Sequence, residues 1–480
     1  MLKLYNTLTK QKEEFKPIHK GKVSIYTCGP TVYDYIHIGN LRSFTTADVL
    51  RRYLEYSGYE VRHIKNITDV GHLTADDIAQ ADTGEDKILK KALAEKKTPE
   101  EIAKFYTEAF HRDEDAVNIL RAHFFPKATA HIPQMIKIIK TLIEKGNAYE
   151  KNGNVFFDVT SFKDYGKLSG NTLEQLKVGA RLEEHPDKKH PWDFALWLKA
   201  DPKHILQWDS PWSRGYPGWH IECSAMATEY LGDTLDIHTG GEDNIFPHHE
   251  AEIAQSECAT DKKFVNFWVH TRHLLVEGEK MSKSKGNFYI LKDIKEKGFD
   301  PMHLRLLYLS SHYRKNLDFS WKAMDQAKAN YERIAEWIGK LKNIVGDAYT
   351  RPESTARVAY MQPLQIFESA MDDDLNTPLA LSILYTLITD TNKKLSKNKL
   401  DSNGASEAFA TFEKMNKVFG LKFPEKETEI LEEVKKLADE RLESRKSKDF
   451  QKSDKLRKEI EKLGYVVEDM DNSYKLKRSL

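Results

Sequence analysis

The first half of this 480-residue chain alternates short β-rich runs with helical stretches, and this alternation limits the fold more than any other feature. Runs rich in β-branched and aromatic residues cover residues 23–28, 61–68, 234–241 and 264–270. A stretch with the apolar spacing of a helix, 41–56, separates the first two runs. Because strands that alternate with helices pair in parallel, the sequence predicts a doubly wound α/β sheet.

The rest of the sequence predicts further units around this sheet. Between the strand pairs, a helical stretch (132–145), a hairpin pattern (148–159) and a polar run indicate an insertion. After about Phe319, glycine becomes sparse and long amphipathic stretches indicate a helical bundle. The expected divisions are the first half of the sheet domain (1–124), the insertion (125–200), the second half (201–270), a loop-bearing region (271–320), the bundle (321–425) and a C-terminal module (426–480).

Helices are expected to dominate the last two divisions. The apolar spacing predicts bundle helices at 321–344, 357–371, 377–395 and 407–419. In the C-terminal module, one charge-rich helix is expected to end near Lys452, a second to cover 453–462, and a short strand to follow Gly464.

Composition and cysteine usage limit the class of protein. Lysine plus arginine equals aspartate plus glutamate, 74 each, so a nucleic-acid partner would have to bind a local patch. The three cysteines are too few and too far apart for a disulfide framework, which favours a reducing compartment. Neither a signal peptide nor an apolar run of about 18 residues is apparent. A cytoplasmic protein with no membrane partner is therefore expected.

One candidate ligand-binding segment, residues 30–40, lies between the first predicted strand and the following helix. Gly39 lets the backbone approach a ligand closely, and a helix N-terminus favours phosphate. His37 and Asn40 are three residues apart, so both side chains can face one ligand near that terminus. The alternative interpretation is a turn with one incidental histidine.

A second candidate segment, residues 279–287, is rich in lysine and serine. Gly278 and Gly286 flank its central part, so a mobile loop is expected. Three lysines within six residues can neutralise a polyphosphate, and the serine hydroxyls add hydrogen-bond donors. The alternative is a solvated charged loop.

A third set of residues carries the donor types of a metal site. Cys28 ends the first predicted strand, where open α/β sheets bind ligands. His248 and Glu252 are four residues apart after Pro247, which suits the first turn of a helix, so they share one helix face. With Cys223 they make a possible zinc shell of two thiolates, an imidazole and a carboxylate. The alternative is two packed cysteines and a surface His–Glu pair.

The first two segments together resemble the paired signatures of class I aminoacyl-tRNA synthetases, HIGH and KMSKS. Residues 37–40 are HIGN, and residues 280–284 are KMSKS. The resemblance implies that His37 and Asn40 contact the phosphates of ATP. It also implies that Lys280 and Lys283 stabilise charge on the α-phosphate and the departing pyrophosphate. The other residues that it assigns to binding of ATP with magnesium are Gly39, Ser282 and Ser284.

Longer strings resemble one family of this class, the cysteinyl-tRNA synthetases, over nearly the whole chain. They cover residues 27–33, 208–223, 236–252 and 448–464. The resemblance implies that one zinc ion binds to Cys28, Cys223, His248 and Glu252 and takes the thiolate of the substrate cysteine. Soft ligands favour zinc, and zinc prefers a sulfur to a serine hydroxyl, so cysteine is expected to be selected without an editing domain. The candidate contacts to the substrate cysteine are Gly29, Thr68 and Trp219.

The resemblance also assigns roles to the predicted divisions. Residues 1–124 and 201–270 would form a Rossmann-like catalytic domain, with 125–200 as its connective-peptide insertion. The region 271–320 would carry the KMSKS loop and contact the tRNA stem, and 426–480 would bind the anticodon. The expected partners are L-cysteine, ATP and tRNA(Cys), and the expected oligomeric state is a monomer. Cys258 lies off every motif and is taken as structural.

The chain departs from the family pattern at two places. Asn40 replaces the final histidine of the first motif and leaves a neutral donor. Residues 70–86 form an extra segment that is interpreted as a surface loop, a lid or a contact to the tRNA end; its polar residues include His72, Asp76, Asp77 and Asp82. Two other functions are weighed: joining cysteine to an amino sugar, and tRNA binding without catalysis. The anticodon-like tail favours tRNA as the acceptor, and the intact motifs favour an enzyme.

Overall fold

The computed structural model describes residues 1–70, 87–172, 185–202, 204–282, 285–345, 361–424, 432–447, 449–470 and 473–478. These residues form two compact units, Met1–Leu421 and Lys422–Leu480, and each is described by itself. Two subjects of the sequence analysis lie outside the described residues. They are the extra segment beyond Val70 and the pair Lys283 and Ser284.

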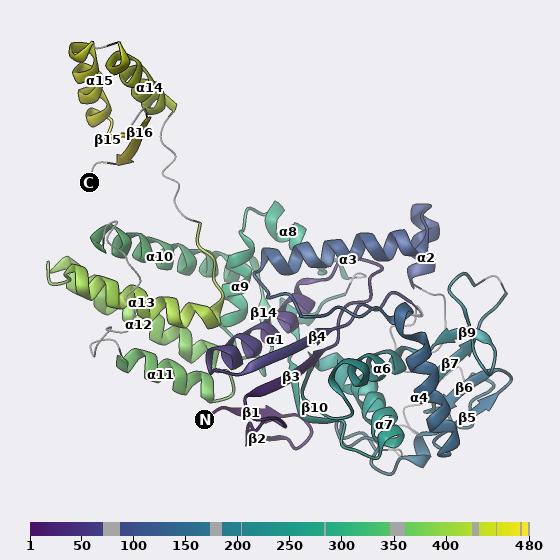
Figure 1. The fold of residues 1–480 in the computed structure, drawn as a ribbon. Helices are drawn as coiled ribbons and strands as arrows, with labels where there is room; N and C mark the ends of the chain where they lie inside the picture. The colour runs from purple at the N-terminus through teal and green to yellow at the C-terminus, as the bar shows by residue number, and fades with distance from the viewer. Residues whose placement is uncertain are drawn as a thin grey trace. The chain divides into compact units, whose positions relative to one another are not determined.

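A four-stranded parallel sheet lies at the centre of the larger unit (Figure 1). In spatial order its strands are β11 (Val265–Thr271), β10 (Leu235–Gly241), β3 (Lys22–Thr27) and β4 (Glu60–Lys65). Ile237 of β10 lies opposite Ile25 of β3 and Phe267 of β11. Most side chains of β10 and β11 are buried, as expected where a parallel sheet is covered on both faces. The predicted doubly wound α/β class is therefore confirmed.

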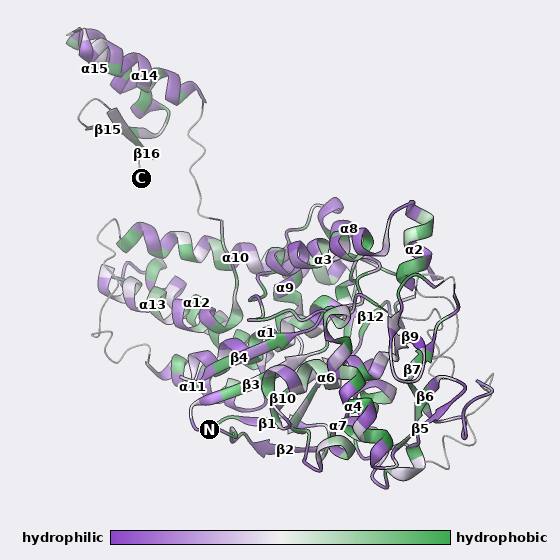
Figure 2. Cartoon of the chain, turned by 45° about the vertical axis from the view of Figure 1, so that its right-hand side comes forward, coloured by the Kyte–Doolittle hydropathy of each residue, from purple (hydrophilic) through white to green (hydrophobic). Residues whose placement is uncertain are grey.

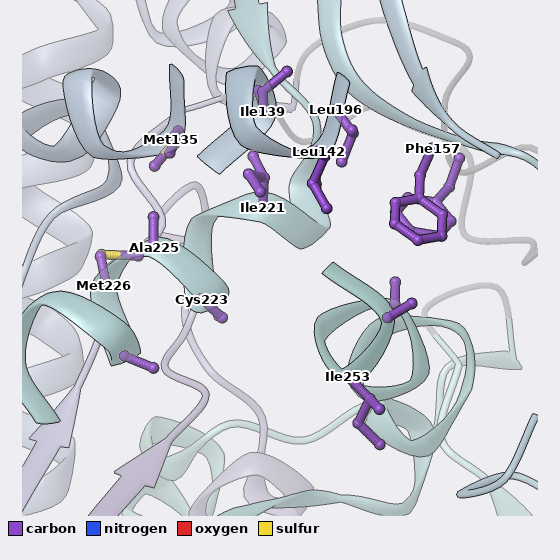
Figure 3. Packing of buried hydrophobic residues seen from close by; sticks show 14 of the residues in the cluster. Met135, Ile139, Leu142, Phe157, Leu196, Ile221, Cys223, Ala225, Met226 and Ile253 are labelled. Atoms are coloured by element: carbon purple, nitrogen blue, oxygen red, sulfur yellow. The ribbon is translucent and has the colours of Figure 1, made fainter. Parts of the chain in front are cut away.

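The helices that follow the strands join the sheet to the insertion through one hydrophobic core. Helix α1 (Ile38–Tyr56) packs against β4, β10 and β11. Helices α4 (Ile132–Glu144), α6 (Trp219–Leu231) and α7 (Glu250–Thr260) pack against one another. Their apolar side chains form one cluster with Phe157 and Leu196 of the insertion, and Figure 3 shows Leu142 of α4 next to Leu196. Cys223 belongs to the same cluster, so α6 carries it on a well-packed scaffold.

The insertion contains its own antiparallel sheet, in the order β5-β6-β7-β9-β8. Its strands are β5 (Ala148–Lys151), β6 (Asn154–Phe157), β7 (Phe194–Lys199), β8 (Trp208–Asp209) and β9 (Arg214–Pro217). The first two strands are the expected hairpin. Because β9 pairs with β7, this sheet extends to Pro217, beyond the expected boundary at residue 200. A two-residue strand such as β8 has no sequence pattern that marks its partner.

Several elements complete the larger unit where the sequence analysis expected none. A hairpin of β1 and β2 begins the chain, α2 and α3 follow the extra segment, and a small sheet and two helices follow β11. Their bounds are β1 (Lys3–Asn6), β2 (Gln11–Glu14), α2 (Lys87–Glu95), α3 (Pro99–Ala116), β12 (Leu274–Val276), β13 (Glu279–Lys280), β14 (Leu317–Phe319), α8 (Leu291–Glu296) and α9 (Pro301–Leu309). Strand β13 contains Lys280, so the lysine-rich segment begins in a hairpin.

The helical bundle packs against the sheet domain, because its last helix contacts α1. Its helices are α10 (Trp321–Val345), α11 (Met361–Asp372), α12 (Thr377–Ser396) and α13 (Ser402–Phe419). Asp401 caps α13 by accepting a hydrogen bond from the amide of Gly404, so this helix begins five residues before the predicted start. Arg305 of α9 joins the bundle to the sheet domain, because it donates to Asp48 of α1 (2.6 Å) and to the carbonyl of Phe419 (2.7 Å).

The smaller unit consists of α14 (Glu432–Lys446), α15 (Phe450–Lys462), β15 (Tyr465–Met470) and β16 (Ser473–Arg478). The prediction that its first helix ends near Lys452 is wrong. Asp449 accepts a hydrogen bond from the amide of Lys452 and caps a new helix there. The expected strand after Gly464 is present and pairs with β16. Across both units, none of the described helices combines the length and the apolar character that a membrane span requires.

Candidate active site and metal centre

An open cleft of the sheet domain lies at the carboxyl ends of β3 and β10. These strands are neighbours in the middle of the sheet, where the chain order reverses, and open α/β sheets bind ligands at such a point. The space between the walls of the cleft, open solvent included, is about 1070 Å³. The cleft is lined by residues from five parts of the chain: Cys28–Thr31, the start of α1, Trp219 at the start of α6, the segment after β10, and the stretch from the end of β11 through the β12–β13 hairpin. The two candidate nucleotide segments and one candidate metal ligand therefore share a single cleft.

The four candidate metal ligands come together at one side of this cleft. Their ligand atoms all lie within 4.8 Å of one another. The sulfurs of Cys28 and Cys223 are 3.7 Å apart, and Cys28 Sγ lies 3.5 Å from Glu252 Oε1. His248 Nε2 is 3.1 Å from the same carboxylate oxygen. Segments from β3, α6, the turn η5 (Ile245–His249) and α7 thus bring two thiols, an imidazole and a carboxylate to one point.

Further imidazoles surround this cluster and orient its members. His220 Nδ1 lies 3.0 Å from His248 Nδ1, which leaves His248 Nε2 facing the cluster. His238 Nε2 lies 3.0 Å from the second oxygen of Glu252. A second set of four also satisfies the geometric requirement of a metal site, with His238 and His249 in place of Cys223 and His248. The first set is favoured because it contains two soft sulfurs and its His248 and Glu252 have separate outer partners.

Charge within the cluster is concentrated on Cys223, His248 and Glu252. Burial and the neighbouring Cys223 raise the pKa of the Cys28 thiol. Burial opposes ionisation of Cys223, but Cys28 and His248 outweigh it and lower the pKa of Cys223 to about 6. Burial is likewise outweighed at Glu252, where His238 and His248 lower the pKa to about 2. Although burial lowers it, the pKa of His248 rises to about 10 beside Cys223 and Glu252. Cys223 and Glu252 thus favour a positive charge on the imidazole between them.

The HIGN segment forms the N-terminal cap of α1. His37 Nδ1 accepts a hydrogen bond from the amide of Asn40 (3.2 Å), and Asn40 Oδ1 accepts one from the amide of His37 (3.1 Å). This reciprocal capping box uses the amide oxygen of Asn40 and gives a physical reason for asparagine at this position. A Cβ at Gly39 would lie 2.9 Å from Met281 Cε. The two nucleotide segments are therefore in contact, and Gly39 permits the close approach.

Lys280 is held across the cleft by an acidic residue that the sequence analysis did not assign a role. Its Nζ lies 2.5 Å from Oδ1 of Asp243, which follows β10 in the turn η4 (Glu242–Asn244). Both side chains are exposed. Beyond Lys280, the amide of Ser282 donates to Asn287 Oδ1 (2.8 Å), which closes the base of the loop.

The three candidate contacts to the substrate cysteine have different surroundings. Gly29 and Trp219 line the cleft, and the Trp219 ring stacks on His248 with centroids 4.6 Å apart. A Cβ at Gly29 would lie 1.7 Å from the carbonyl oxygen of Asn66, so only glycine fits. Thr68 is buried behind this wall, where its hydroxyl donates to Glu222 (2.9 Å). Thr68 therefore contacts the wall of the cleft and does not line it.

Two groups of site residues were missed by sequence reasoning. The outer histidines His220, His238 and His249 lie next to predicted motif positions, but no spacing rule distinguishes them from packed histidines. Arg42 lies one helical turn after Ile38 and is buried, and its partners are main-chain carbonyls distant in sequence. The only signal in the sequence was an arginine near the start of the predicted helix 41–56, and the sequence does not show that its side chain is buried.

Comparison with known proteins agrees with this geometry. Residues 14–329 match the family "tRNA synthetases class I (C) catalytic domain", and residues 366–424 match the "DALR domain". The fold and this match define a class I tRNA synthetase. Proteins named cysteine–tRNA ligase from Chlorobaculum tepidum and Thermus thermophilus are 46% and 44% identical, each over 98% of this chain and 97% of their own length. The corresponding protein of Clostridioides difficile is 42% identical over 99% of this chain and all of its own. The chain belongs to the cysteine–tRNA ligase family.

A solved structure agrees at the level of the fold. Methionyl-tRNA synthetase of Mycobacterium tuberculosis in complex with methionyl-adenylate superposes with a TM-score of 0.60. The superposition covers 83% of this chain and 90% of that chain at 13% sequence identity, so the likeness concerns the fold alone.

Proposed function

We propose that this chain activates L-cysteine with ATP and transfers the cysteinyl group to the 3′ end of tRNA(Cys), with zinc selecting the thiol. One observation carries the proposal. The four candidate zinc ligands meet within 4.8 Å at the side of the cleft that both nucleotide segments line. Relatives named cysteine–tRNA ligase, which match the chain along its whole length, support the same activity.

The donor set fits zinc in both chemistry and spacing. In a tetrahedral site, zinc–sulfur bonds of about 2.3 Å separate two sulfurs by about 3.8 Å. The sulfurs of Cys28 and Cys223 are 3.7 Å apart. The other two candidate ligand atoms, His248 Nε2 and Glu252 Oε1, are 3.1 Å apart. A zinc ion held there would accept the substrate thiolate as an additional ligand and would discriminate against a hydroxyl. Trp219, stacked on His248, would form the adjoining wall of the side-chain pocket.

Binding of ATP is assigned to the start of α1 and to the lysine loop. The positive end of the α1 dipole lies at His37, where it favours the phosphates. Lys280 contacts Asp243 across the cleft, and this exposed ion pair is weak enough for a polyphosphate to replace the carboxylate. Lys280 and Lys283 together would stabilise the charge that develops as pyrophosphate leaves. No side chain needs to form a covalent bond, because the chain acts by positioning and by charge stabilisation.

Transfer to tRNA is favoured over transfer to a small amine. The chain continues past the catalytic domain through the DALR domain and the smaller unit, and the match to its relatives covers 97–100% of their own length. In the second step, a ribose hydroxyl of the terminal adenosine would attack the carbonyl carbon of the adenylate, and AMP would leave. A cytoplasmic location, a monomeric state, magnesium with ATP, and anticodon binding by the smaller unit remain predictions.

An acceptor assay tests the proposal. The purified protein would be given radiolabelled cysteine, ATP and magnesium, together with either a tRNA(Cys) transcript or amino sugars. We expect labelled tRNA and no labelled sugar conjugate. Ligation to an amino sugar without charging of tRNA would assign the chain to the alternative reaction, and the absence of cysteine-dependent pyrophosphate exchange would refute activation itself.

A further inference from the structure

A strongly basic segment lies beside the cleft although the whole chain has no net charge. Residues 87–97, which comprise α2 and the turn before α3, contain five lysines and one glutamate. The glutamate, Glu95, already has partners. It accepts hydrogen bonds from Lys97 Nζ (2.8 Å) and the hydroxyl of Tyr106 (3.0 Å), and Lys91 Nζ lies 3.4 Å away. Within residues 87–97 the lysines therefore outnumber the acidic residues by four.

Aromatic side chains are interleaved with these lysines. Tyr35, Phe105 and Tyr106 pack edge to face, with centroids 5.1–6.2 Å apart. Two of the rings reach the surface, because Tyr35 is 37% and Phe105 is 38% exposed. Lys97 Nζ lies 5.1 Å from the centroid of the Phe105 ring. On α2 itself, Leu93 is 76% exposed, and Figure 2 shows hydrophobic and hydrophilic positions side by side on this helix.

This surface borders the candidate active site. The loop 31–37 has its first and last residues in the wall of the cleft. The residues between them contact α2: Lys87 Nζ lies 5.5 Å from the centroid of the Tyr33 ring, and Lys91 Nζ lies 3.9 Å from Asp34 Oδ1. Helices α2 and α3 are in contact, and Figure 1 shows α2 at one end of α3; Phe105 of α3 contacts Tyr35 and extends this surface.

We propose that the α2–α3 surface, defined by Tyr35, Leu93, Lys96, Lys97 and Phe105, binds the unpaired 3′ end of the tRNA. The proposal rests on the proposed function, because the terminal nucleotide must enter the cleft in which the amino acid is activated. The nucleotides before it then pass the wall that α2 adjoins. Lysines attract their phosphates, while exposed rings and Leu93 offer contacts to base faces without reading sequence.

Binding of two forms of the same tRNA tests the proposal. The dissociation constants of full-length tRNA(Cys) and of tRNA(Cys) without its four 3′-terminal nucleotides would be measured for wild-type protein, Phe105→Ala and Lys96→Ala/Lys97→Ala. Loss of a base–ring contact or of two phosphate contacts is expected to weaken binding of the full-length tRNA by about fivefold or more. Binding of the shortened tRNA should be unchanged. Lys137→Ala/Lys140→Ala removes two exposed lysines from α4 and serves as the matched control.

The outcomes separate this proposal from the proposed function. Cysteine-dependent pyrophosphate exchange is expected to keep its wild-type rate in all the variants, because none of the substituted residues lines the cleft. If both tRNAs lose affinity equally, or if neither does, the α2–α3 surface does not bind the 3′ end. If wild-type protein neither exchanges pyrophosphate with cysteine nor binds tRNA(Cys), the proposed function itself fails.

Discussion

The side chain of Arg42 joins the helix that follows HIGN to the segments on either side of the lysine loop. It is 2% exposed. Its Nη1 donates to the carbonyls of Arg272 (2.8 Å) and His273 (2.7 Å), and its Nη2 donates to those of Lys315 (2.6 Å) and His312 (3.4 Å). Burial lowers the pKa of Arg42 to about 10, so the guanidinium stays charged at pH 7.

Replacing Arg42 by methionine tests how much these hydrogen bonds contribute to the free energy of unfolding. The substitution removes the Arg42 donors from four carbonyls. Those of His273 and His312 keep main-chain donors, the amides of Leu317 (3.1 Å) and Lys315 (2.9 Å), whereas each buried group that is left unsatisfied costs about 1–3 kcal/mol. Because the main chain can relax, we expect a total loss of roughly 3–5 kcal/mol, as for other buried charged networks. Arg42→Lys keeps the charge but not the planar fork, and it should lose less.

Urea unfolding followed by tryptophan fluorescence would measure this loss. All eight tryptophans lie before residue 422, so the signal reports the larger unit alone. The same variants should raise the KM for ATP in pyrophosphate exchange more than the KM for cysteine, because Arg272 and His273 lead into the hairpin that carries Lys280. An unfolding free energy within about 1 kcal/mol of wild type for Arg42→Met would refute the reasoning.

Three further predictions concern the metal, the lysine loop and the fold. Cys223→Ser should abolish stoichiometric zinc in elemental analysis and raise the KM for cysteine, whereas Cys258→Ser should do neither; zinc retained in Cys223→Ser would remove this ligand from the site. Lys280→Ala should lower kcat for pyrophosphate exchange by about 10²-fold or more, as for other transition-state donors. Lys285→Ala removes a lysine that contacts Glu279 (2.8 Å) and should have little effect, so equal losses would argue against a specific role for Lys280. Although burial opposes its ionisation, Arg305 and Arg52 hold the pKa of Asp48 below its usual value. Its stabilisation is therefore complete above about pH 4 and is lost as the pH falls below that value. Asp48→Asn should lower Tm at pH 7, and the difference from wild type should shrink in acid; a constant difference would contradict this account.

Local patterns in the sequence predicted the helices and strands that depend on the spacing of apolar residues. Residues 23–28 and 61–68 alternate with a long amphipathic stretch, and these became β3, β4 and α1 with bounds that differ by a few residues. Cys28 could be placed at a ligand-binding edge because carboxyl ends of parallel strands meet there. Spacing also put His248 and Glu252 on one helix face, and their side chains do meet at 3.1 Å.

Features that depend on tertiary contacts could not be predicted in the same way. The insertion sheet extends to Pro217 because β9 pairs with β7. The residues of β8 and β9 contain no pattern that predicts which strand they pair with. The break between α14 and α15 depends on the single cap at Asp449, which a run of charged helix formers conceals. Similarly, Asp243 becomes the partner of Lys280 only when the turn after β10 and strand β13 come together at the same cleft.

The central claim is that the cysteine and histidine cluster beside the cleft selects the amino acid. Its most direct test is the ratio of kcat/KM for cysteine to that for serine in ATP–pyrophosphate exchange, measured with zinc-loaded protein. The two substrates differ by one atom, sulfur or oxygen, so discrimination must come from the group that contacts it. A ratio of about 10⁴ or more is expected where a site coordinates a specific group. A ratio near the 10- to 200-fold range of simple pocket packing would contradict selection at a metal.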